Sequence, residues 1–440
     1  MAAYEETIAA VATPPGEGAI AMVRISGPDT KKILAGIFKT QSPQPKPRTA
    51  SFGKILDGEE MVDQVLVTRF EAPASFTGED MAEISCHGGI LLAAKILELV
   101  LRHGARAAEP GEFSQRAFFN GKIDLTRAEA IMDIISARTP LALRAAAQQL
   151  EGRLGTEILA LRNSALETVA HIEAFIDFPE EGIDPASGRV LLEKIQNLLA
   201  RTTALLGTAD EGRILREGVR VAIAGKPNAG KSSLLNRLLG MDRAIVSEIP
   251  GTTRDTIEET ACLRGILYRL TDTAGLRETS DPVERQGVAR TERALESADL
   301  VLHVIDASTE EIPAALRENE ILVANKSDLP CPALPPGAIA VSCTTGAGFD
   351  QLLDAMSEAA GLRHLAAGQS LAAINARHKA LLEATRSSLV AAATLVQSNE
   401  PPELAALELR AALDTLGRIV GTTDTEDILG EIFSRFCIGK

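Results

Sequence analysis

The sequence predicts a multidomain protein of the α/β plus α class, in which a doubly wound α/β domain is inserted into a helical domain. Short strand-like runs separated by turn signals fill residues 1–120. Ala- and Leu-rich stretches with apolar residues at helical spacing fill residues 121–217 and 367–440. Short apolar strands alternate with helices over residues 218–366. A chain of 440 residues also exceeds what one hydrophobic core usually supports, so we expect separate domains at these ranges.

The first range is predicted to form a small α+β unit. Residues Thr7–Thr13 and Ala19–Ile25 are strand-like runs separated by Pro-Pro-Gly-Glu-Gly, a turn signal that predicts a hairpin. Further strand-like runs lie at Gln64–Phe70 and Met81–Cys86, and a helix is expected from about Gly89 to His103. The order of these elements indicates an N-terminal domain distinct from the helical ranges.

The helical ranges are defined by their composition. From Leu125 to about Leu215 the chain is rich in Ala, Leu, Glu, Gln and Arg, which predicts two or three long helices. A break is expected around Phe178–Pro185, where Pro, Gly and acidic residues gather. The same composition returns after Gly368, and the α/β range between the two helical stretches is therefore interpreted as an insertion.

Composition and charge limit the class of protein. A net charge of −15 argues against a broad, sequence-independent grip on nucleic acid, although a local basic patch can still dock RNA. The sequence has no signal segment and no run of about 18 uncharged apolar residues, so we expect a soluble, cytoplasmic protein that does not enter a membrane. Scattered cysteines without a C-x-x-C pair suit free thiols in a reducing compartment: Cys86, Cys262, Cys331, Cys343 and Cys437.

The clearest motif opens the α/β range. Gly225–Ser233 reads Gly-Lys-Pro-Asn-Ala-Gly-Lys-Ser-Ser and fits the phosphate-loop pattern G-x-x-x-x-G-K-[ST]. The apolar strand Val219–Ala224 precedes it and a predicted helix, Ser232–Leu239, follows it. The glycines let backbone N–H groups surround phosphate oxygens, Lys231 reaches the outer phosphates, and the Ser232 hydroxyl can ligate magnesium. We predict a nucleotide site rather than a glycine-rich turn.

Four further motifs follow in the order and spacing of a guanine-nucleotide switch protein. They are Gly251–Asp255, Asp272–Gly275, Asn325–Asp328 and Ser342–Gly346. The Thr253 hydroxyl can complete a magnesium shell when the outer phosphate is present, and Asp272 ends a strand, Leu267–Thr271, beside the metal. The Gly275 N–H can sense the same phosphate. Each motif alone is a common sequence, but all of them in this order predict GTP binding.

The motif Asn325–Asp328 predicts selection of guanine over adenine. It follows the strand Ile321–Ala324 and therefore lies at the carboxyl edge of the predicted sheet, where ligands of such folds bind. The Asp328 carboxylate accepts two hydrogen bonds from the guanine ring and its exocyclic amine, a pair of donors that adenine lacks. Ser342 and the Cys343 backbone close over the base. An ATP-dependent motor is disfavoured for the same reason.

Two departures from the small-GTPase scheme bear on hydrolysis. Leu276 stands where a water-orienting Gln often stands, and an apolar side chain cannot orient the attacking water. No arginine finger can be identified, because Arg254, Arg277 and Arg285 all lie near enough in the chain to be candidates. Another group must therefore position the water.

These motifs, with several segments outside them, carry a resemblance to a known family. Over nearly its whole length the chain resembles the MnmE family, also called TrmE, of tRNA-modifying GTPases. The segments that carry the resemblance are Gly225–Asn236, Gly251–Asp255, Asp272–Glu278, Thr13–Gly16, Ser75–Asp80, Phe113–Phe118 and Phe436–Lys440. The last four lie outside the GTPase motifs and few other GTPases share them, so the resemblance is specific.

The resemblance implies a Ras-like GTPase domain inserted in a helical domain, and a homodimer formed through an N-terminal, folate-binding-like domain. GTPase domains of this family dimerise across their nucleotides with bound potassium, which supplies the charge of the missing arginine finger. The implied potassium ligands are Asn228, Ser247, Ile249 and Thr252, and the implied magnesium ligands are Ser232 and Thr253. On sequence alone, Asn228 would be a turn-stabilising residue.

Two residues are catalytic candidates. Lys231 reaches the outer phosphates, and Glu284 falls on the water-positioning acidic residue of the family, from where it can act through a bridging water as general base. Spacing alone would make Glu284 a solvated helix charge. The residues placed at GTP are Asn228, Ala229, Gly230, Lys231, Ser232, Ser233, Ser247, Glu248, Ile249, Pro250, Gly251, Thr252, Thr253, Asp272, Thr273, Ala274, Gly275, Asn325, Lys326, Asp328 and Ser342.

The resemblance also implies a folate site in the N-terminal domain. The family binds a reduced folate, 5-formyl- or 5,10-methylene-tetrahydrofolate, and Arg24, Glu83, Lys122 and the terminal Lys440 fall on folate-contacting positions. Cations can hold the glutamate tail of a folate, and a carboxylate suits the donors of the pterin edge. Without the resemblance, Arg24 is a strand-end surface charge and Lys440 merely a chain end.

Cys437 is the one cysteine within a family segment. It follows an amphipathic stretch, so it is expected at the end of a helix that faces a core or a pocket. A buried, inert thiol is one interpretation and a reactive role near the folate is the other.

The implied activity is that of the GTP-hydrolysing component of an enzyme that modifies C5 of the wobble uridine in tRNA, by carboxymethylaminomethyl or aminomethyl addition. The implied partner is an FAD-containing protein of the MnmG (GidA) type, in a heterotetramer. The one-carbon unit comes from the folate, the reducing equivalents from the flavin, and the amine from glycine or ammonia. The alternative is a regulatory GTPase of ribosome assembly without modification activity, which the GTPase motifs alone cannot separate from the first.

Overall fold

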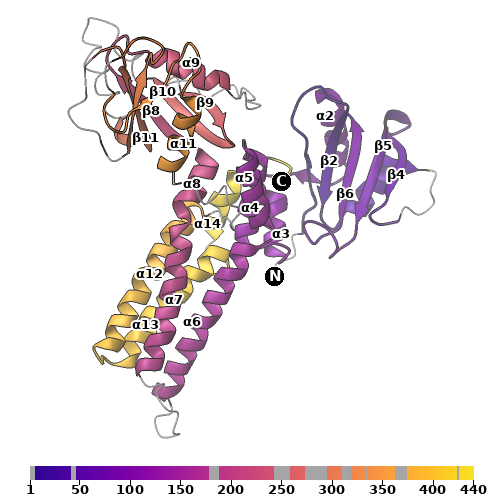
Figure 1. The fold of residues 1–440 in the computed structure, drawn as a ribbon. Helices are drawn as coiled ribbons and strands as arrows, with labels where there is room; N and C mark the ends of the chain where they lie inside the picture. Colours follow the sequence, from indigo (N-terminus) through magenta and orange to yellow (C-terminus); the bar gives the residue numbers. More distant parts are fainter. Residues whose placement is uncertain are drawn as a thin grey trace, which may run out of the picture. The chain divides into compact units, whose positions relative to one another are not determined.

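The computed structural model describes residues 5–40, 46–177, 188–241, 258–272, 295–309, 317, 319–331, 334–361, 374–423 and 426–440. The chain divides into two compact units. The N-terminal unit comprises Met1–Met132 with Gly417–Lys440, and the central unit comprises Asp133–Leu416. Figure 1 shows the elements of both units. The predicted multidomain α/β plus α class is confirmed, whereas the four domain boundaries stay predictions.

A seven-stranded sheet forms the body of the N-terminal unit, in the order β3-β4-β5-β6-β2-β1-β7. Its strands are β1 (Ile8–Val11), β2 (Ile20–Ser26), β3 (Phe38–Thr40), β4 (Ala50–Asp57), β5 (Glu60–Phe70), β6 (Met81–His87) and β7 (Arg106–Ala107). β1 and β2 pair antiparallel, which confirms the predicted hairpin. Only β7 joins the sheet in parallel, beside β1. The strands β3 and β4 were not predicted, because the Pro-rich stretch between them resembles a long loop.

The helices of the N-terminal unit include one that was predicted, α2 (Ile90–Arg102), and one that was not, α1 (Thr30–Ile37). Both contribute to the core on one face of the sheet, where Ile33 and Ile96 pack with the inward side chains of β2 and β6. The remaining helices here are α3 (Glu112–Phe119), α4 (Leu125–Ser136) and α14 (Glu426–Ser434), with α4 extending past Met132. The other face of the sheet carries large apolar side chains that are exposed, among them Ile20 and Phe52.

The central unit contains a six-stranded sheet in the order β13-β12-β11-β8-β10-β9. The strands are β8 (Val219–Gly225), β9 (Glu258–Leu263), β10 (Ile266–Asp272), β11 (Leu300–Asp306), β12 (Glu320–Asn325) and β13 (Ile339–Ala340). All neighbours pair in parallel except β9, which forms an antiparallel hairpin with β10. β8 and β11 are almost continuously apolar, as expected for strands buried on both faces. The helices α9 (Lys231–Met241) and α11 (Phe349–Ala359) belong to this α/β region.

The helices that belong to the helical part of the central unit are α5 (Pro140–Leu150), α6 (Arg153–Asp177), α7 (Gly188–Gly207), α8 (Ala209–Glu217), α12 (Ala376–Gln397) and α13 (Pro402–Val420), with α13 extending past Leu416. Of those before β8, α6 and α7 are long, in agreement with the predicted two or three long helices, whereas α5 and α8 are shorter. Thr139 caps the start of α5, and Gly152, at φ +90°, separates α5 from α6. The expected break at 178–185 lies outside the described residues. None of the described helices combines the length and apolar character that crossing a membrane requires.

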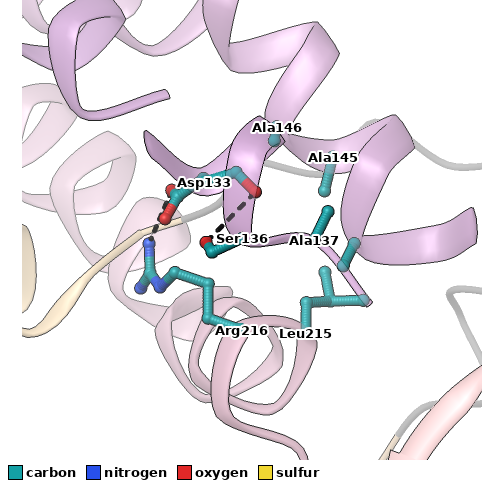
Figure 2. A pocket seen from close by; sticks show the side chains of 8 residues that line it. Asp133, Ser136, Ala137, Ala145, Ala146, Leu215 and Arg216 are labelled. Atoms are coloured by element: carbon teal, nitrogen blue, oxygen red, sulfur yellow. Dashed lines mark hydrogen bonds and ion pairs between the residues drawn. The ribbon is translucent and has the colours of Figure 1, made fainter. Parts of the chain in front are cut away.

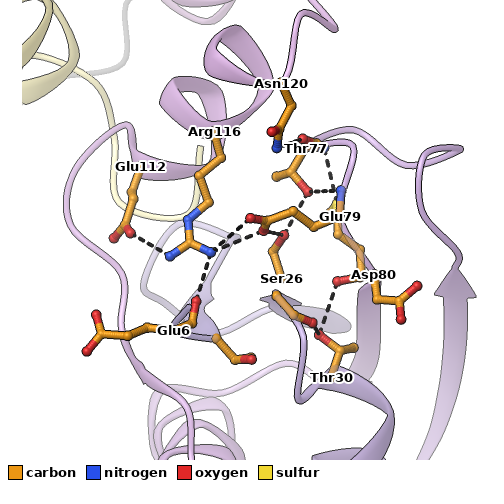
Figure 3. Close-up of polar contacts among 12 residues, drawn as sticks. Glu6, Ser26, Thr30, Thr77, Glu79, Asp80, Glu112, Arg116 and Asn120 are labelled. Atoms are coloured by element: carbon orange, nitrogen blue, oxygen red, sulfur yellow. Dashed lines mark hydrogen bonds and ion pairs between the residues drawn. The ribbon is translucent and has the colours of Figure 1, made fainter. Parts of the chain in front are cut away.

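A buried arginine links separate segments of the N-terminal unit (Figure 3). The Arg116 side chain is fully buried and donates to the Glu6 carbonyl at 2.9 Å, to Glu79 Oε2 at 3.1 Å and to Glu112 Oε1 at 2.9 Å. Glu79 also accepts from the Ser26 hydroxyl at 2.7 Å. Two of the family segments named above, Ser75–Asp80 and Phe113–Phe118, therefore meet through this ion pair. Sequence reasoning assigned it no role.

The carboxylate of Glu112 is held in its charged form. Burial by itself would raise its pKa, but hydrogen bonds from Arg106, from the Glu109 N–H and from Arg116 outweigh burial and lower the pKa below its ordinary value. A group with a lowered pKa contributes stability above its unfolded pKa and loses it as the pH falls through the folded value. The cluster therefore stabilises the unit at neutral pH.

We predict that Arg116→Met lowers the free energy of unfolding of the N-terminal unit by about 3 kcal/mol, because the partly buried Glu79 loses its ion pair with Arg116 and the buried Glu112 keeps only Arg106 of its two arginine partners. The matched control is Arg102→Ala, which removes an exposed arginine from Asp57 and should change stability by less than about 1 kcal/mol. The stability of both variants is measured by urea unfolding, with amide exchange of α3 and β6 as the probe of the N-terminal unit. Equal effects of the two substitutions would contradict the prediction.

Candidate functional site

The phosphate loop follows directly from β8, at the centre of the six-stranded sheet. Gly225 has φ +141° and Gly230 has φ +96°, backbone conformations that favour glycine. Space requires glycine as well, since a side chain at Gly225 would collide with the Val304 carbonyl of β11 and one at Gly230 with the Asn325 amide. Asn228 also has a positive φ, +62°, within the same loop. The loop is therefore shaped by its neighbours on two adjacent strands.

Lys231 begins α9 and is buried, and its side chain folds back over the loop. Its ammonium donates to the carbonyls of Gly225 at 2.9 Å and Lys226 at 2.8 Å. These bonds hold a positive charge at the loop and restrict its position. Ser233 lies exposed in the first turn of α9, and the backbone N–H groups of that turn form the positive end of the helix dipole.

Ser232 and Asp272 meet beside the phosphate loop. The Ser232 hydroxyl donates to Asp272 Oδ2 at 2.9 Å. Asp272 is the last residue of β10 and pairs in register with Ile223 of β8, so the parallel pairing of these strands brings the carboxylate to the loop. A hydroxyl and a carboxylate are oxygen ligands of the kind that magnesium prefers. This donor set fits the predicted metal site.

The predicted base-recognition loops lie at the carboxyl ends of β12 and β13. Asn325 is buried, its amide donates to the Ala229 carbonyl at 3.0 Å, and its side-chain oxygen accepts from the Cys343 N–H at 3.3 Å. The buried Ser342 hydroxyl donates to Asp328 Oδ1 at 2.6 Å. Asn325 thus connects the phosphate loop to both base-recognition loops and fixes the spacing between them.

Asp306 takes part in this site although sequence reasoning did not identify it. It ends β11, and its carboxylate accepts from the Lys326 ammonium at 2.5 Å. That hydrogen bond, together with those from Ser308, lowers the pKa of Asp306. Lys326 has φ +65°, an uncommon backbone conformation for a residue other than glycine. The ion pair with Asp306 holds the side chain of this residue in place. The signal in the sequence was the position of Asp306 at the end of an apolar strand.

Much of the predicted site lies outside the described residues. This holds for Ser247, Glu248, Ile249, Pro250, Gly251, Thr252, Thr253, Thr273, Ala274, Gly275, Leu276 and Glu284, and for Arg254, Arg277 and Arg285. Among the implied potassium ligands only Asn228 is described, and of the magnesium pair only Ser232. The other residues placed at GTP gather at one edge of the sheet: Asn228, Ala229, Gly230, Lys231, Ser232, Ser233, Asp272, Asn325, Lys326, Asp328 and Ser342.

A second group of predicted residues lies in the N-terminal unit. Arg24 of β2 and Glu83 of β6 are direct partners in the antiparallel register, and Arg24 Nη2 lies 2.7 Å from Glu83 Oε1. Arg24 Nη1 donates to the Gly439 carbonyl at 3.1 Å, which brings the chain end to the same place. The guanidinium also lies 5.8 Å from the ring centre of Phe76 and 5.7 Å from that of Phe113. Charge and aromatic surface are therefore adjacent.

The other two predicted folate contacts, Lys122 and Lys440, have different partners within the N-terminal unit. Lys122 Nζ donates to the Pro73 carbonyl at 2.9 Å, at the far end of the loop that carries Phe76. The Lys440 backbone N–H donates to the Cys437 carbonyl at 3.3 Å. Gly439, at φ +91°, packs so closely on the Val11 carbonyl that a side chain would not fit there. The structure brings Arg24 and Glu83 together with the terminal turn, while Lys122 contacts the neighbouring loop.

The prediction that Cys437 rides the end of a helix and faces a core or pocket is wrong. α14 ends at Ser434, and Cys437 lies beyond it with an exposed side chain. The amphipathic pattern ends at Phe436, which is buried against Phe433. The carbonyl of Cys437, by contrast, accepts from the Gly111 N–H at 3.4 Å. Its backbone therefore anchors the terminal segment while its thiol faces outward.

Comparison with known proteins gives these arrangements a context. The profile of the GTP-binding protein TrmE N-terminus matches residues 7–122, and that of the MnmE helical domain matches residues 125–437. Three relatives are each named tRNA modification GTPase MnmE. That of Akkermansia muciniphila is 51% identical, covering 99% of this chain and 99% of the relative. Those of Moorella thermoacetica and Geobacter metallireducens are both 45% identical over 99% of this chain, covering 100% and 99% of the relatives. The chain belongs to the MnmE (TrmE) family of tRNA modification GTPases.

Proposed function

We propose that this chain hydrolyses GTP as part of the enzyme that modifies C5 of the wobble uridine in tRNA, adding a carboxymethylaminomethyl or aminomethyl group. The observation that carries the proposal is the bond from Asn325 to the Ala229 carbonyl, which places a guanine-recognition loop at a fixed distance from a phosphate loop. Membership of the family supplies the tRNA substrate. The proposed cellular site is the cytoplasm.

Binding of GTP is divided between two rigid parts of the sheet edge. Backbone N–H groups of the phosphate loop and the Lys231 ammonium hold the phosphates, and the lysine is already positioned by two loop carbonyls. Ser232 and Asp272 hold magnesium, directly or through water, and Thr253 is proposed as the further ligand. The metal neutralises charge on the outer phosphates.

Guanine is selected by Asp328. Its carboxylate accepts from the ring N–H and the exocyclic amine, and the Ser342 hydroxyl fixes its orientation at 2.6 Å. Lys326, Asn325 and the Cys343 backbone complete the walls of the base site. Adenine offers neither donor, so the carboxylate covered by the bound base would be left without both partners.

Hydrolysis is assigned to residues that the family resemblance implies. Glu284 positions the attacking water, a role that Leu276 cannot take. Asn228 is proposed to hold potassium together with Ser247, Ile249 and Thr252, and the amide oxygen of Asn228 is suitable chemistry for an alkali cation. Potassium, when bound, supplies positive charge at the transferred phosphate. This arrangement requires two GTPase domains to face one another in a homodimer.

The open face of the N-terminal sheet supports the homodimer. Phe52 of β4 is 63% exposed and Leu66, its register partner on β5, is 46% exposed, while Ile20 of β2 is 66% exposed. Large, exposed apolar side chains on one part of a sheet face are typical of a protein interface. An MnmG-type protein carrying FAD is the proposed second component, in a heterotetramer with this dimer.

The folate is assigned to the surroundings of Arg24. A guanidinium that is partly buried against Phe76 and Phe113 suits a flat, anionic ligand, and Glu83 suits the donors of a pterin edge. Lys122 and Lys440 are proposed to hold the glutamate tail. When bound, 5-formyl- or 5,10-methylene-tetrahydrofolate supplies the one-carbon unit. The reducing equivalents come from the flavin of the partner protein, and the amine from glycine or ammonium.

We predict that Asp328→Asn weakens GTP binding by about two orders of magnitude, because the amide offers one acceptor where guanine presents two donors. The same amide matches xanthine, which has an N–H beside a carbonyl, so binding of XTP should improve. Titration with fluorescent GTP, competed by XTP and ATP, measures both effects. Unchanged GTP affinity would contradict the assignment of the base site.

We expect Glu284→Ala to keep GTP affinity while hydrolysis falls by roughly two orders of magnitude, the usual scale for an acid–base group. Single-turnover hydrolysis is measured with potassium and with sodium. The wild-type protein should hydrolyse faster in potassium, which separates loss of the base from loss of the cation. If the variant hydrolyses GTP in potassium at the wild-type rate, the assignment is wrong.

Arg24→Ala should weaken binding of 5-formyltetrahydrofolate by at least about tenfold, since it removes a charge-assisted contact, and should leave GTP hydrolysis unchanged. Nucleoside analysis of tRNA from cells carrying only this variant should show loss of the C5 modification, as in cells without the chain. Arg102→Ala, an exposed arginine–carboxylate pair in the same unit, is the control. Normal modification in cells that lack the chain would overturn the proposed function itself.

A further inference from the structure

We propose that α5, a helix of the helical part, transmits changes at the nucleotide site to that part of the central unit, and that the β9–β10 hairpin makes the connection. The proposal goes beyond GTP hydrolysis to its coupling, and it rests on the proposed assignment of Ser232 and Asp272 to magnesium-bound GTP. It begins from an apolar core that is shared between two regions of the chain.

The core of the six-stranded sheet extends into α5 and α8. Ala145 of α5 and Leu215 of α8 are buried in the same cluster as Val219 and Ile266, and Leu141 of α5 packs against it. These two helices precede the phosphate loop in the chain and belong to the helical composition. Close-packed interiors transmit displacements because they contain little free space. The apolar core of the six-stranded sheet therefore does not end at β8 but continues into α5 and α8.

The hairpin joins this core to the metal site. At one end of β10, Asp272 accepts from Ser232; at the other, Arg264 and Gly265 form a two-residue turn with φ +52° and +80°. Such a turn is stiff, since both residues occupy the left-handed region. A methyl group added to Gly265 would lie 3.6 Å from Leu141 Cδ1, so the turn lies beside α5, and Leu141 packs against the core that contains the next residue, Ile266. One short strand thus has the metal carboxylate at one end and α5 at the other.

A second connection reaches the same turn from the base-recognition loop. The Arg264 guanidinium pairs with Asp354 and with Asp350 Oδ1, both on α11. α11 begins at Phe349, directly after the Ser342–Gly346 motif. Movement of either the phosphate side or the base side of the nucleotide site is therefore passed to the Arg264–Gly265 turn and from there to Leu141.

α5 and α8 also border a small pocket. Figure 2 shows a pocket lined by Ala146 of α5, Leu215 and Arg216 of α8, and Asp133 and Ser136 at the end of α4. Arg216 lies 3.5 Å from Asp133 and donates to the Ile374 carbonyl at 2.6 Å, where the described chain resumes before α12. Ala145 and Leu215 belong both to the lining of this pocket and to the apolar core, so a displacement of α5 in the core also changes the pocket.

Two leucines on α5 provide a matched test. Leu141 packs against the nucleotide core, whereas Leu143, two residues later, is 48% exposed. Amide exchange of α5, α8 and the middle of α12 is measured in the full-length protein without nucleotide, with GDP and magnesium, and with a non-hydrolysable GTP analogue. In the wild-type protein we expect exchange in α5 to differ at least about twofold between the GDP and GTP-analogue states, with the middle of α12 as reference.

Leu141→Ala should abolish this nucleotide-dependent difference in α5 and keep the protection of α12, while Leu143→Ala should behave as the wild-type protein does. Nucleotide affinities are measured on the same samples. Because coupling is reciprocal, Leu141→Ala should also alter the ratio of GDP to GTP-analogue affinity by at least about twofold. The coupling proposal fails if α5 exchanges identically in all states of a protein that binds both nucleotides, or if Leu141→Ala responds as the wild type does. Failure of the wild-type protein to bind either nucleotide would instead overturn the proposed GTP site.

Discussion

The nucleotide region depends on one buried cation. The Lys231 ammonium is held between two carbonyls of the loop that it follows, and a positive charge in that position is tolerated only because those carbonyls are directed at it. The loop also contains Gly225 and Gly230 at positive φ values, and the absence of a side chain at both positions leaves room for the Val304 carbonyl and the Asn325 amide. The order β11-β8-β10 then supplies the rest of the site, because parallel strands end at one edge.

Sequence reasoning predicted this edge well because its signals are local. Gly225, Gly230, Lys231 and Ser232 lie within eight consecutive positions, and the strand before them is marked by apolar residues. The hairpin of β1 and β2 was also predictable, since its turn residues stand between the two strands. In such cases a few neighbouring residues determine the backbone, and the tertiary structure adds little.

Other features could not be predicted because they depend on pairs far apart in the chain. Arg116 meets Glu79 across 37 positions, and Lys326 meets Asp306 across 20, with nothing in either local sequence to indicate the partner. The prediction for the Cys437 side chain was wrong for a different reason. A helical pattern predicts which face is buried only while the helix continues, and α14 ends three residues before this cysteine. The loops proposed to hold potassium and Glu284 lie outside the described residues, so their prediction rests on the family resemblance.

In each unit an arginine joins two segments that are far apart in the chain. In the central unit, Arg216 of α8 donates to the Ile374 carbonyl, so the segment that leaves for the nucleotide sheet is tied to the segment that comes back. In the N-terminal unit, Arg24 donates to the Gly439 carbonyl and joins β2 to the last residues of the chain. A carbonyl acceptor is available on any returning backbone, whereas side-chain complementarity would have to arise at both positions. In both units the arginine also contacts a carboxylate, Asp133 or Glu83, which restricts the direction of the guanidinium.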